Sequence, residues 1–117
     1  MTACVYYDNI QLVIDFDKIE GFDWDGGNAR KNEKHGVTQA EAEQVFVNEH
    51  LLLTPDEKHS THEQRFRAYG QTSSGQLLTV IFTLRAKGTI IRIISARDMH
   101  LKERRVYEEK AKTDTQI

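Results

Sequence analysis

The sequence contains one cysteine, Cys4, which excludes an intramolecular disulfide and is compatible with a reducing cytoplasm. It has no apolar run near the ~20 residues that a membrane-spanning helix needs. Residues 1–16 lack the basic start and the long apolar stretch of a signal peptide. Glycine-rich phosphate loops and nucleophile elbows are also missing. We therefore expect a cytoplasmic protein without a membrane segment.

Charge is distributed unevenly along a chain of 117 residues, a length that fits one domain. Residues 1–64 carry 5 Lys/Arg against 13 Asp/Glu, a balance of −8, and residues 65–117 carry 11 against 5, a balance of +6. Together they give the net charge of −2. The basic half holds seven arginines: Arg65, Arg67, Arg85, Arg92, Arg97, Arg104 and Arg105.

Arginine stays charged at biological pH and binds phosphate through a planar fork. Single arginines on a sheet often only make an exposed face soluble. Between residues 65 and 105, however, the local acids are Asp98 and Glu103 alone. This shortage of local partners favours an external polyanion, or an acidic protein, as the ligand of the basic half.

Helices are predicted in both halves of the chain. The clearest start is the pair Thr38 and Glu41, which forms a capping box that can satisfy free backbone amides of the first turn. A polar helix should precede it, closed by Gly36. The predicted helices span Asn28–His35, Thr38 to about Phe46 or Asn48, and Met99–Lys112.

Strands are predicted where β-branched and aromatic residues cluster. The early candidates are Cys4–Tyr7, Ile10–Phe16, Gly21–Trp24 and Leu51–Leu53. From Arg65 onward, apolar and polar residues alternate with a period of two. Three strands separated by turn sequences then predict an antiparallel meander: Arg65–Gly70, Leu77–Arg85 and Thr89–Ser95. The expected fold class is α+β.

Strand alternation predicts which arginines share a face of the sheet. Arg65 and Arg67 point the same way, and Arg85 lies opposite the apolar side of its own strand. Arg92 and Arg97 are five residues apart, so a regular strand would place them on opposite faces. A strand end or turn near Ser95 and Ala96 is one way to bring Arg97 round.

Few other residues carry chemistry. His35, beside Lys34 at a predicted helix end, is the candidate for proton transfer, because imidazole titrates near neutral pH; capping of the helix end is the competing explanation. His59 and His62 near Asp56 are interpreted as a solvated loop, since their spacing does not match a zinc site. We expect no metal and no cofactor.

Taken together, these segments resemble the BrnT family of bacterial toxins, ribonucleases of type II toxin–antitoxin systems. Each motif is weak alone, whereas their order and spacing are specific. The matching segments are Gly21–Asp25, Gly27-Asn28, Lys34–Val37, Glu41–Glu43, Pro55–Ser60, Arg65 with Gly70, Phe82–Arg85, Ile91–Met99, and Lys102–Arg105 with Tyr107.

The resemblance implies a RelE-like fold, with a three-stranded meander plus an N-terminal strand, two N-terminal helices and a C-terminal helix. The toxin domain would span residues 21–112, between an N-terminal arm or extra β-hairpin (1–20) and a flexible tail (113–117). The implied activity is RNA cleavage without a metal ion, which inhibits translation. The implied partner is a BrnA-like ribbon-helix-helix antitoxin, through which alone the complex would contact operator DNA.

By similarity, the expected catalytic residues are Lys34, His35, Arg65 and Arg97. The expected RNA contacts are Arg67, Arg85, Arg92 and Tyr107. One departure is Gln71, where the family commonly has arginine, which removes a possible phosphate contact. The alternatives are a non-catalytic basic module that binds an acidic partner, or a degenerate, inactive toxin. A plain RNA-binding domain is disfavoured, because the basic face offers few aromatic residues beyond Tyr69 for base stacking.

Overall fold

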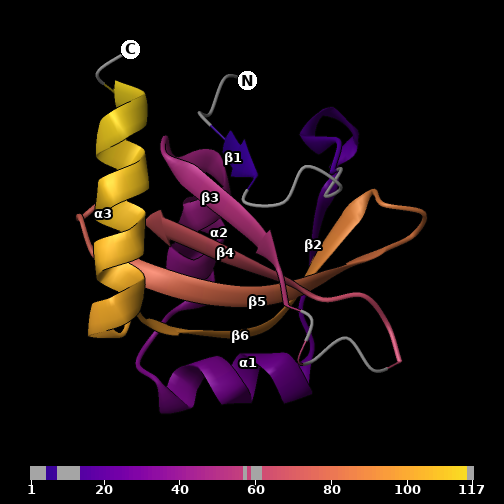
Figure 1. Cartoon of the computed structure of the whole chain (residues 1–117). Helices are drawn as coiled ribbons and strands as arrows, with labels where there is room; N and C mark the ends of the chain where they lie inside the picture. The colour runs from indigo at the N-terminus through magenta and orange to yellow at the C-terminus, as the bar shows by residue number, and fades with distance from the viewer. Residues whose placement is uncertain (1–4, 8–13, 57, 59–61, 116–117) are drawn as a thin grey trace.

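The protein is described by a computed structural model over residues 5–7, 14–56, 58 and 62–115, and this part of the chain is α+β (Figure 1). It contains six strands, three α-helices and a short 3-10 helix. In chain order these are β1 (Val5–Tyr7), η1 (Phe16–Lys18), β2 (Gly21–Asp23), α1 (Gly26–Lys34), α2 (Gln39–Val47), β3 (Leu51–Pro55), β4 (Phe66–Gln71), β5 (Leu77–Arg85), β6 (Ile90–Asp98) and α3 (Leu101–Thr115).

The strands form one mixed sheet in the order β1-β3-β4-β5-β6-β2. Strands β3 to β6 are antiparallel neighbours, whereas β1 runs parallel to β3 and β2 runs parallel to β6. The predicted meander of β4, β5 and β6 is confirmed. The expectation of only one further strand is wrong, because β3 extends the sheet beyond β4 and a short parallel strand adds to each side.

The N-terminal elements agree with the sequence only in part. Strand β1 begins at Val5, and Cys4 lies outside the described residues. Of the strand predicted at Ile10–Phe16, residues 10–13 also lie outside them, and Phe16 begins the helix η1 instead of ending a strand. Ile14 is buried in the main core. Among the helices described, none is long and apolar enough to cross a membrane.

The start of α2 is the local prediction that the structure confirms in atomic detail. The Thr38 backbone amide donates to Glu41 Oε1 at 2.9 Å, and the Glu41 amide donates to Thr38 Oγ1 at 3.1 Å. This reciprocal pair is the predicted capping box. It fixes where the chain turns from α1 into the helix that covers the sheet.

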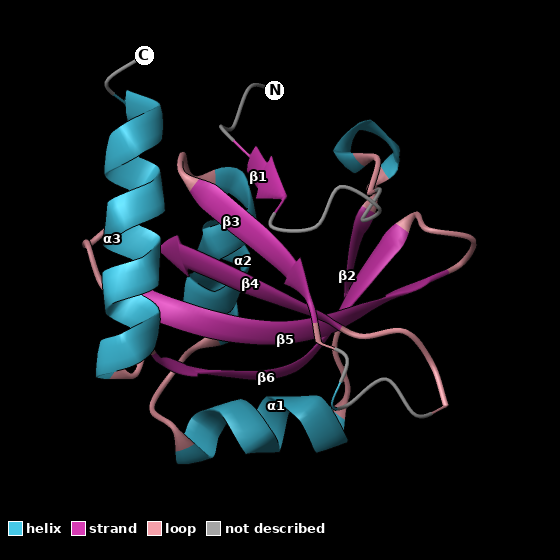
Figure 2. Ribbon diagram, in the orientation of Figure 1, coloured by secondary structure: helices cyan, strands magenta, loops and turns pink. Residues whose placement is uncertain are grey.

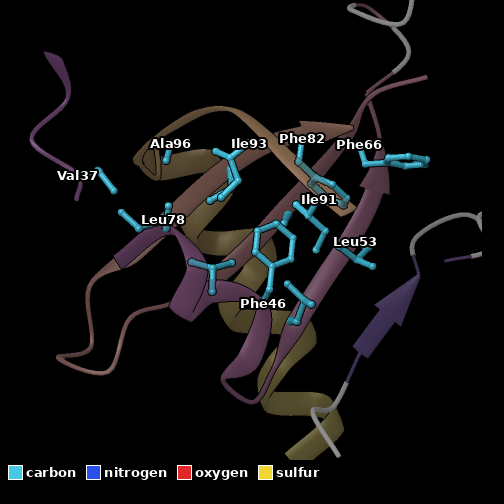
Figure 3. Close-up of a cluster of buried hydrophobic side chains, with 14 of the residues drawn as sticks. Val37, Phe46, Leu53, Phe66, Leu78, Phe82, Ile91, Ile93 and Ala96 are labelled. Atoms are coloured by element: carbon cyan, nitrogen blue, oxygen red, sulfur yellow. The ribbon is translucent and has the colours of Figure 1, made fainter. Parts of the chain in front are cut away.

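Helices cover the two sides of the sheet differently (Figure 2). Helix α2 packs behind β4 and β5, and α3 packs against β3 and β4 at one end of the other side. We call these sides the α2 face and the α3 face. On the α2 face, Phe82 lies 4.9 Å from Phe46 and 5.4 Å from Phe66 between ring centroids (Figure 3). The cluster on the α3 face is smaller and contains Leu52, Tyr69, Met99 and Tyr107.

A register shift interrupts the long hairpin of β5 and β6. Ser95 lies opposite Ile81, but the next pair is Ile93 opposite Phe82. Ile94 is therefore an extra residue in β6, which is the definition of a β-bulge. After the bulge, each side chain of β6 points to the face opposite to the one that it would occupy in a strand without the extra residue.

The bulge places Arg92 and Arg97 on the same face. Arg92 lies opposite Thr83 and Arg97 lies opposite Thr79. These two threonines are four residues apart in β5, so they point to the same side of the sheet. A regular strand would have placed the two arginines on opposite faces. A bulge within β6 turns Arg97 to the face of Arg92. The strand does not end near Ser95 and Ala96 but continues to Asp98.

Helix α2 approaches β4 closely at Gly70. A Cβ atom built on Gly70 would lie 2.7 Å from Val45 Cγ1 and 3.2 Å from the Val45 carbonyl oxygen. Because Val45 is fully buried, neither atom has room to retreat. Glycine at this position therefore sets the distance between helix and sheet.

We predict that Gly70→Ala destabilises the protein by about 1–3 kcal/mol, the usual cost of overpacking a core. Chemical denaturation monitored by circular dichroism measures this cost. The matched control is Gly21→Ala in β2, where an added Cβ meets nothing within 4 Å; it should change the free energy of unfolding by less than about 0.5 kcal/mol. Equal midpoints for the two variants would contradict the packing argument.

Candidate functional site

The arginines of the sheet gather on the α3 face. The registers place Arg67 of β4 opposite Ile81 of β5, on the same side as Thr79 and Thr83. Arg92 and Arg97 of β6 join them there. Helix α3 covers one end of this face, so the arginines form a polar surface beside the helix.

Arg97 is held by a carboxylate from α3. Its Nη1 donates to Glu103 Oε1 at 2.7 Å and its Nη2 donates to Glu103 Oε2 at 2.9 Å. Nη1 also donates to the Asp98 carbonyl oxygen at 3.1 Å. The result is a bidentate ion pair, the strongest geometry for these two groups.

Glu103 binds more than Arg97. Its Oε1 also accepts the Thr79 hydroxyl at 3.0 Å and the His100 backbone amide at 2.8 Å. Burial alone would raise the pKa of Glu103, but the hydrogen bonds from Arg97 and the His100 amide lower it to about 2. One carboxylate thus joins β5, β6 and the start of α3.

This pairing leaves Arg97 with donors to spare. Glu103 occupies the end of the guanidinium formed by Nη1 and Nη2. Guanidinium has five N–H groups in a planar fork. The Nε–H and the second Nη2–H have no hydrogen-bond partner among the described residues, and the side chain is 27% exposed. These two hydrogens form the other edge of the plane, which fits two oxygens of a phosphate.

Arg67, next along the face, is anchored to a buried acid. Its Nη2 lies 3.0 Å from Asp56 Oδ1, and the Asp56 side chain is fully buried. Its Nη1 donates to the Tyr69 hydroxyl at 3.3 Å. Burial alone would lower the pKa of Arg67, but the hydrogen bond to Tyr69 and the charge of Asp56 raise it. Arg67 is a fixed cation whose tip reaches solvent.

Arg92 has a mainly structural environment. It bridges Asp23 Oδ2 at 3.1 Å and Asp25 Oδ2 at 3.0 Å. Backbone amides of Asn28 and Gly27 donate to Asp25 and lower its pKa, so this carboxylate caps α1. The salt bridges therefore tie β6 to β2 and to the start of α1.

Asn28, from the segment Gly27-Asn28 of the family resemblance, has a structural role. It is buried, and its Nδ2 donates to the carbonyl oxygens of Asp23 at 2.8 Å and Ile93 at 2.9 Å. Its Oδ1 accepts the Asp25 amide at 2.7 Å. The segment from Asp23 to Asn28 thus serves to dock α1 on β6. Its contribution to the α3 face is the pair of carboxylates that bind Arg92.

Arg65 and Arg85 lie at the end of the face away from α3. The Thr83 hydroxyl donates to the carbonyl oxygen of Gln64, so Arg65, just before β4, lies level with Thr83 and Arg92. Arg85 pairs with Glu63 at 3.2 Å. Strand geometry puts the Cα atoms of Arg65 and Arg97 roughly 16 Å apart. The strand registers thus place Arg65 and Arg97 at opposite ends of the α3 face.

The carboxylates that bind these arginines come mainly from the acidic half of the chain. Asp56 pairs with Arg67, Glu63 with Arg85, and Asp23 and Asp25 with Arg92. The argument that the basic half lacks acidic partners is corrected by this finding, because it counted only acids close in sequence. Much of the charge asymmetry is neutralised within the fold.

His35 and Lys34 lie toward the Arg97 end of the sheet. Helix α1 starts beside Ile93, to which Asn28 donates, and runs along β6 (Figure 1). Val37, two residues after His35, shares the core cluster of the α2 face with Ala96, whereas the side chain of Arg97, the neighbour of Ala96, points to the α3 face (Figure 3). The His35 side chain is exposed, whereas the side chain of Lys34 lies outside the described residues.

Tyr107 is a residue of α3 on the side of the helix that faces the sheet, and 4% of its surface is exposed. It packs with Leu52, Tyr69 and Met99, and burial raises the pKa of its hydroxyl to about 12. This position argues against the RNA contact expected for Tyr107. We interpret it as the residue that docks α3 on the sheet.

Sequence patterns did not predict some of the partners. Thr79 belongs to no recognised motif, and Asp56, within the family segment Pro55–Ser60, was interpreted as part of a solvated loop. A polar residue within an apolar strand, such as Thr79, indicates only weakly that another element covers that face of the sheet. Within the described part of the chain, no group of three or more His, Cys, Asp or Glu side chains could hold a metal ion.

Residues 24–103 match the sequence profile of a family described as the ribonuclease toxin, BrnT, of type II toxin–antitoxin systems. The match covers about two thirds of the chain. The chain belongs to the BrnT family. No curated protein matches it closely enough to serve as a relative. The matched segment includes His35, Arg97 and Glu103, whereas Tyr107 lies beyond it.

We predict that Glu103 makes the protein sensitive to acid. Its pKa in the folded protein is about 2, below the ordinary 4.5, so its contribution is fully present above pH 4.5 and is lost as the pH falls toward 2. The contribution is about 3 kcal/mol at most. Urea denaturation at several pH values should show the difference between wild type and Glu103→Gln shrinking across this window. A constant difference would contradict it.

Proposed function

We propose that this BrnT-family chain is the toxin of a type II toxin–antitoxin system and cuts RNA without a metal ion. Membership of a ribonuclease toxin family supports the activity. The observation that carries the assignment of the site is Arg97, which is fixed by Glu103 and keeps a second edge for phosphate. A bacterial toxin of this kind would act in the cytoplasm, where its RNA substrate is.

The proposed reaction is transesterification within the RNA strand. A base removes the proton of a 2′-hydroxyl, and the 2′-oxygen attacks the adjacent phosphorus. The bond from phosphorus to the 5′-oxygen breaks, and an acid protonates that leaving oxygen. The products are a 2′,3′-cyclic phosphate and a 5′-hydroxyl end. No external oxidant, reductant or metal is needed to balance this reaction.

Arg97 is the proposed stabiliser of charge at the reacting phosphate. Negative charge builds on the phosphoryl oxygens in the transition state, and a preorganised guanidinium stabilises it without reorganising. Arg67 lies next along the α3 face and is suited to a neighbouring phosphate. Arg65, Arg85 and Arg92 lie farther along the same face, where they would contact the RNA strand and not the reacting group.

His35 is the proposed acid or base, with Lys34 as its substitute. It follows α1, whose end lies toward Arg97, and its ring is exposed to solvent. Imidazole can accept and donate a proton near neutral pH. To use this residue, RNA bound at the Arg97 end of the sheet must also reach the end of α1.

The partner is proposed to be a ribbon-helix-helix antitoxin of the BrnA type. A type II system implies a protein antitoxin, and the DNA-binding class is an expectation from the family resemblance. Contact with operator DNA would then occur only through the antitoxin. The RelE-like likeness expected from the sequence belongs to the same proposal, supported by the four antiparallel strands at the centre of the sheet and by helices on both of its sides.

We predict that the purified protein cleaves RNA in EDTA, and that Arg97→Ala lowers the rate about 10²–10³-fold, as the loss of one charge-stabilising donor does. The measurement is the initial rate on a labelled oligonucleotide, with analysis of the product ends. The matched control is Arg105→Ala, which removes the same charge from the exposed side of α3 and should leave the rate within a few-fold.

Two results would count against the nuclease. Intact RNA at high protein excess favours the non-catalytic module or an inactive toxin. Cleavage of an oligonucleotide in which the attacking 2′-hydroxyl is replaced by hydrogen would exclude the proposed chemistry.

We predict that His35→Ala lowers cleavage about 10²–10⁴-fold, the usual contribution of a positioned acid or base. His62→Ala, which alters an exposed histidine in a loop, is the control and should cleave normally. Both variants should melt at the wild-type temperature. If His35→Ala retains the wild-type rate, His35 has no part in the mechanism and Lys34→Ala becomes the variant to test.

A further inference from the structure

Glu103 and Asp56 are more buried than the other carboxylates that bind sheet arginines. The partners of Arg92 are 43% and 56% exposed, whereas Glu103 is 13% exposed. Its two oxygens accept four hydrogen bonds from three different elements. Thr79, one of the donors, is fully buried. Glu103 is therefore fixed on all sides before any ligand arrives.

A fixed carboxylate fixes its arginine. A free arginine side chain loses rotamer entropy when it binds a ligand. The bidentate bond to Glu103 takes up this loss during folding. It also sets the plane of the guanidinium, so the edge formed by Nε–H and the second Nη2–H keeps one direction. Reaction rates depend steeply on such placement.

We infer that Glu103 is a positioning residue for Arg97 in RNA cleavage. The inference rests on the proposed function, since it assigns a role within the same site. Glu103 acts through Arg97 and does not touch the substrate. Its negative charge also has a cost, because it weakens the attraction of the site for a polyanion. Orientation and attraction therefore respond to Glu103 in opposite directions.

These opposite effects give a signature in the kinetics of Glu103→Gln. The amide presents only one acceptor, so the two-pronged bond to Arg97 is lost and kcat should fall about 10–100-fold. The KM should stay unchanged or decrease, because one negative charge beside the phosphate has been removed. Arg97→Ala should lower kcat and also raise KM, because it removes a phosphate contact.

The experiment compares four proteins on one RNA oligonucleotide: wild type, Glu103→Gln, Arg97→Ala and the double variant. If Glu103 acts only through Arg97, adding Glu103→Gln to Arg97→Ala causes no further loss of kcat. Glu108→Gln, on the exposed side of α3, is the matched control.

Three outcomes would overturn the inference. A wild-type kcat for Glu103→Gln shows that Arg97 needs no positioning. A further loss of kcat in the double variant shows that Glu103 acts on the substrate directly. A rise in KM that parallels a fall in melting temperature shows a merely structural role. If wild type itself leaves RNA intact, the proposed nuclease and this inference fail together, whereas the first three outcomes leave the nuclease in place.

Discussion

The hydrogen bonds to the Glu103 carboxylate determine the geometry of the candidate site. They join β5 through Thr79, β6 through Arg97 and the first turn of α3 through the His100 amide. The same bonds that dock the helix also orient the arginine. Stability and function are consequently coupled at this residue, and a change that loosens α3 is expected to disturb the guanidinium.

Pairing between the two halves of the chain explains how a protein with so many arginines keeps an ordered basic face. Acidic residues from the first half bind Arg67, Arg85 and Arg92, which are brought next to them by the sheet. An arginine with one edge bound to a carboxylate still has donors for a phosphate. The α3 face is thus better described as a set of oriented donors than as a region of excess charge.

The sequence predicted the elements better than their arrangement. The capping box at Thr38 and the strand Leu77–Arg85 depend on residues close in the chain, so local patterns located both. The bulge at Ile94 depends on pairing with β5, and no local pattern announced it. The ion pairs of Arg67 and Arg92 join segments far apart in sequence, so a count of neighbouring acids missed them. The family resemblance made Arg97 a catalytic candidate and included Glu103 among its matching residues, but the pairing of the two emerged only from the structure.

The most direct test of this account is the NMR signal of the Arg97 Nε–H group during titration with an oligonucleotide that lacks 2′-hydroxyls and is not cleaved. We predict that this signal shifts in a saturable way, and that the Nη signals bonded to Glu103 stay in slow exchange with water. A signal of Arg97 that remains unchanged while those of Arg67 and Arg92 shift would contradict the account, because the RNA would then bind the face without using Arg97.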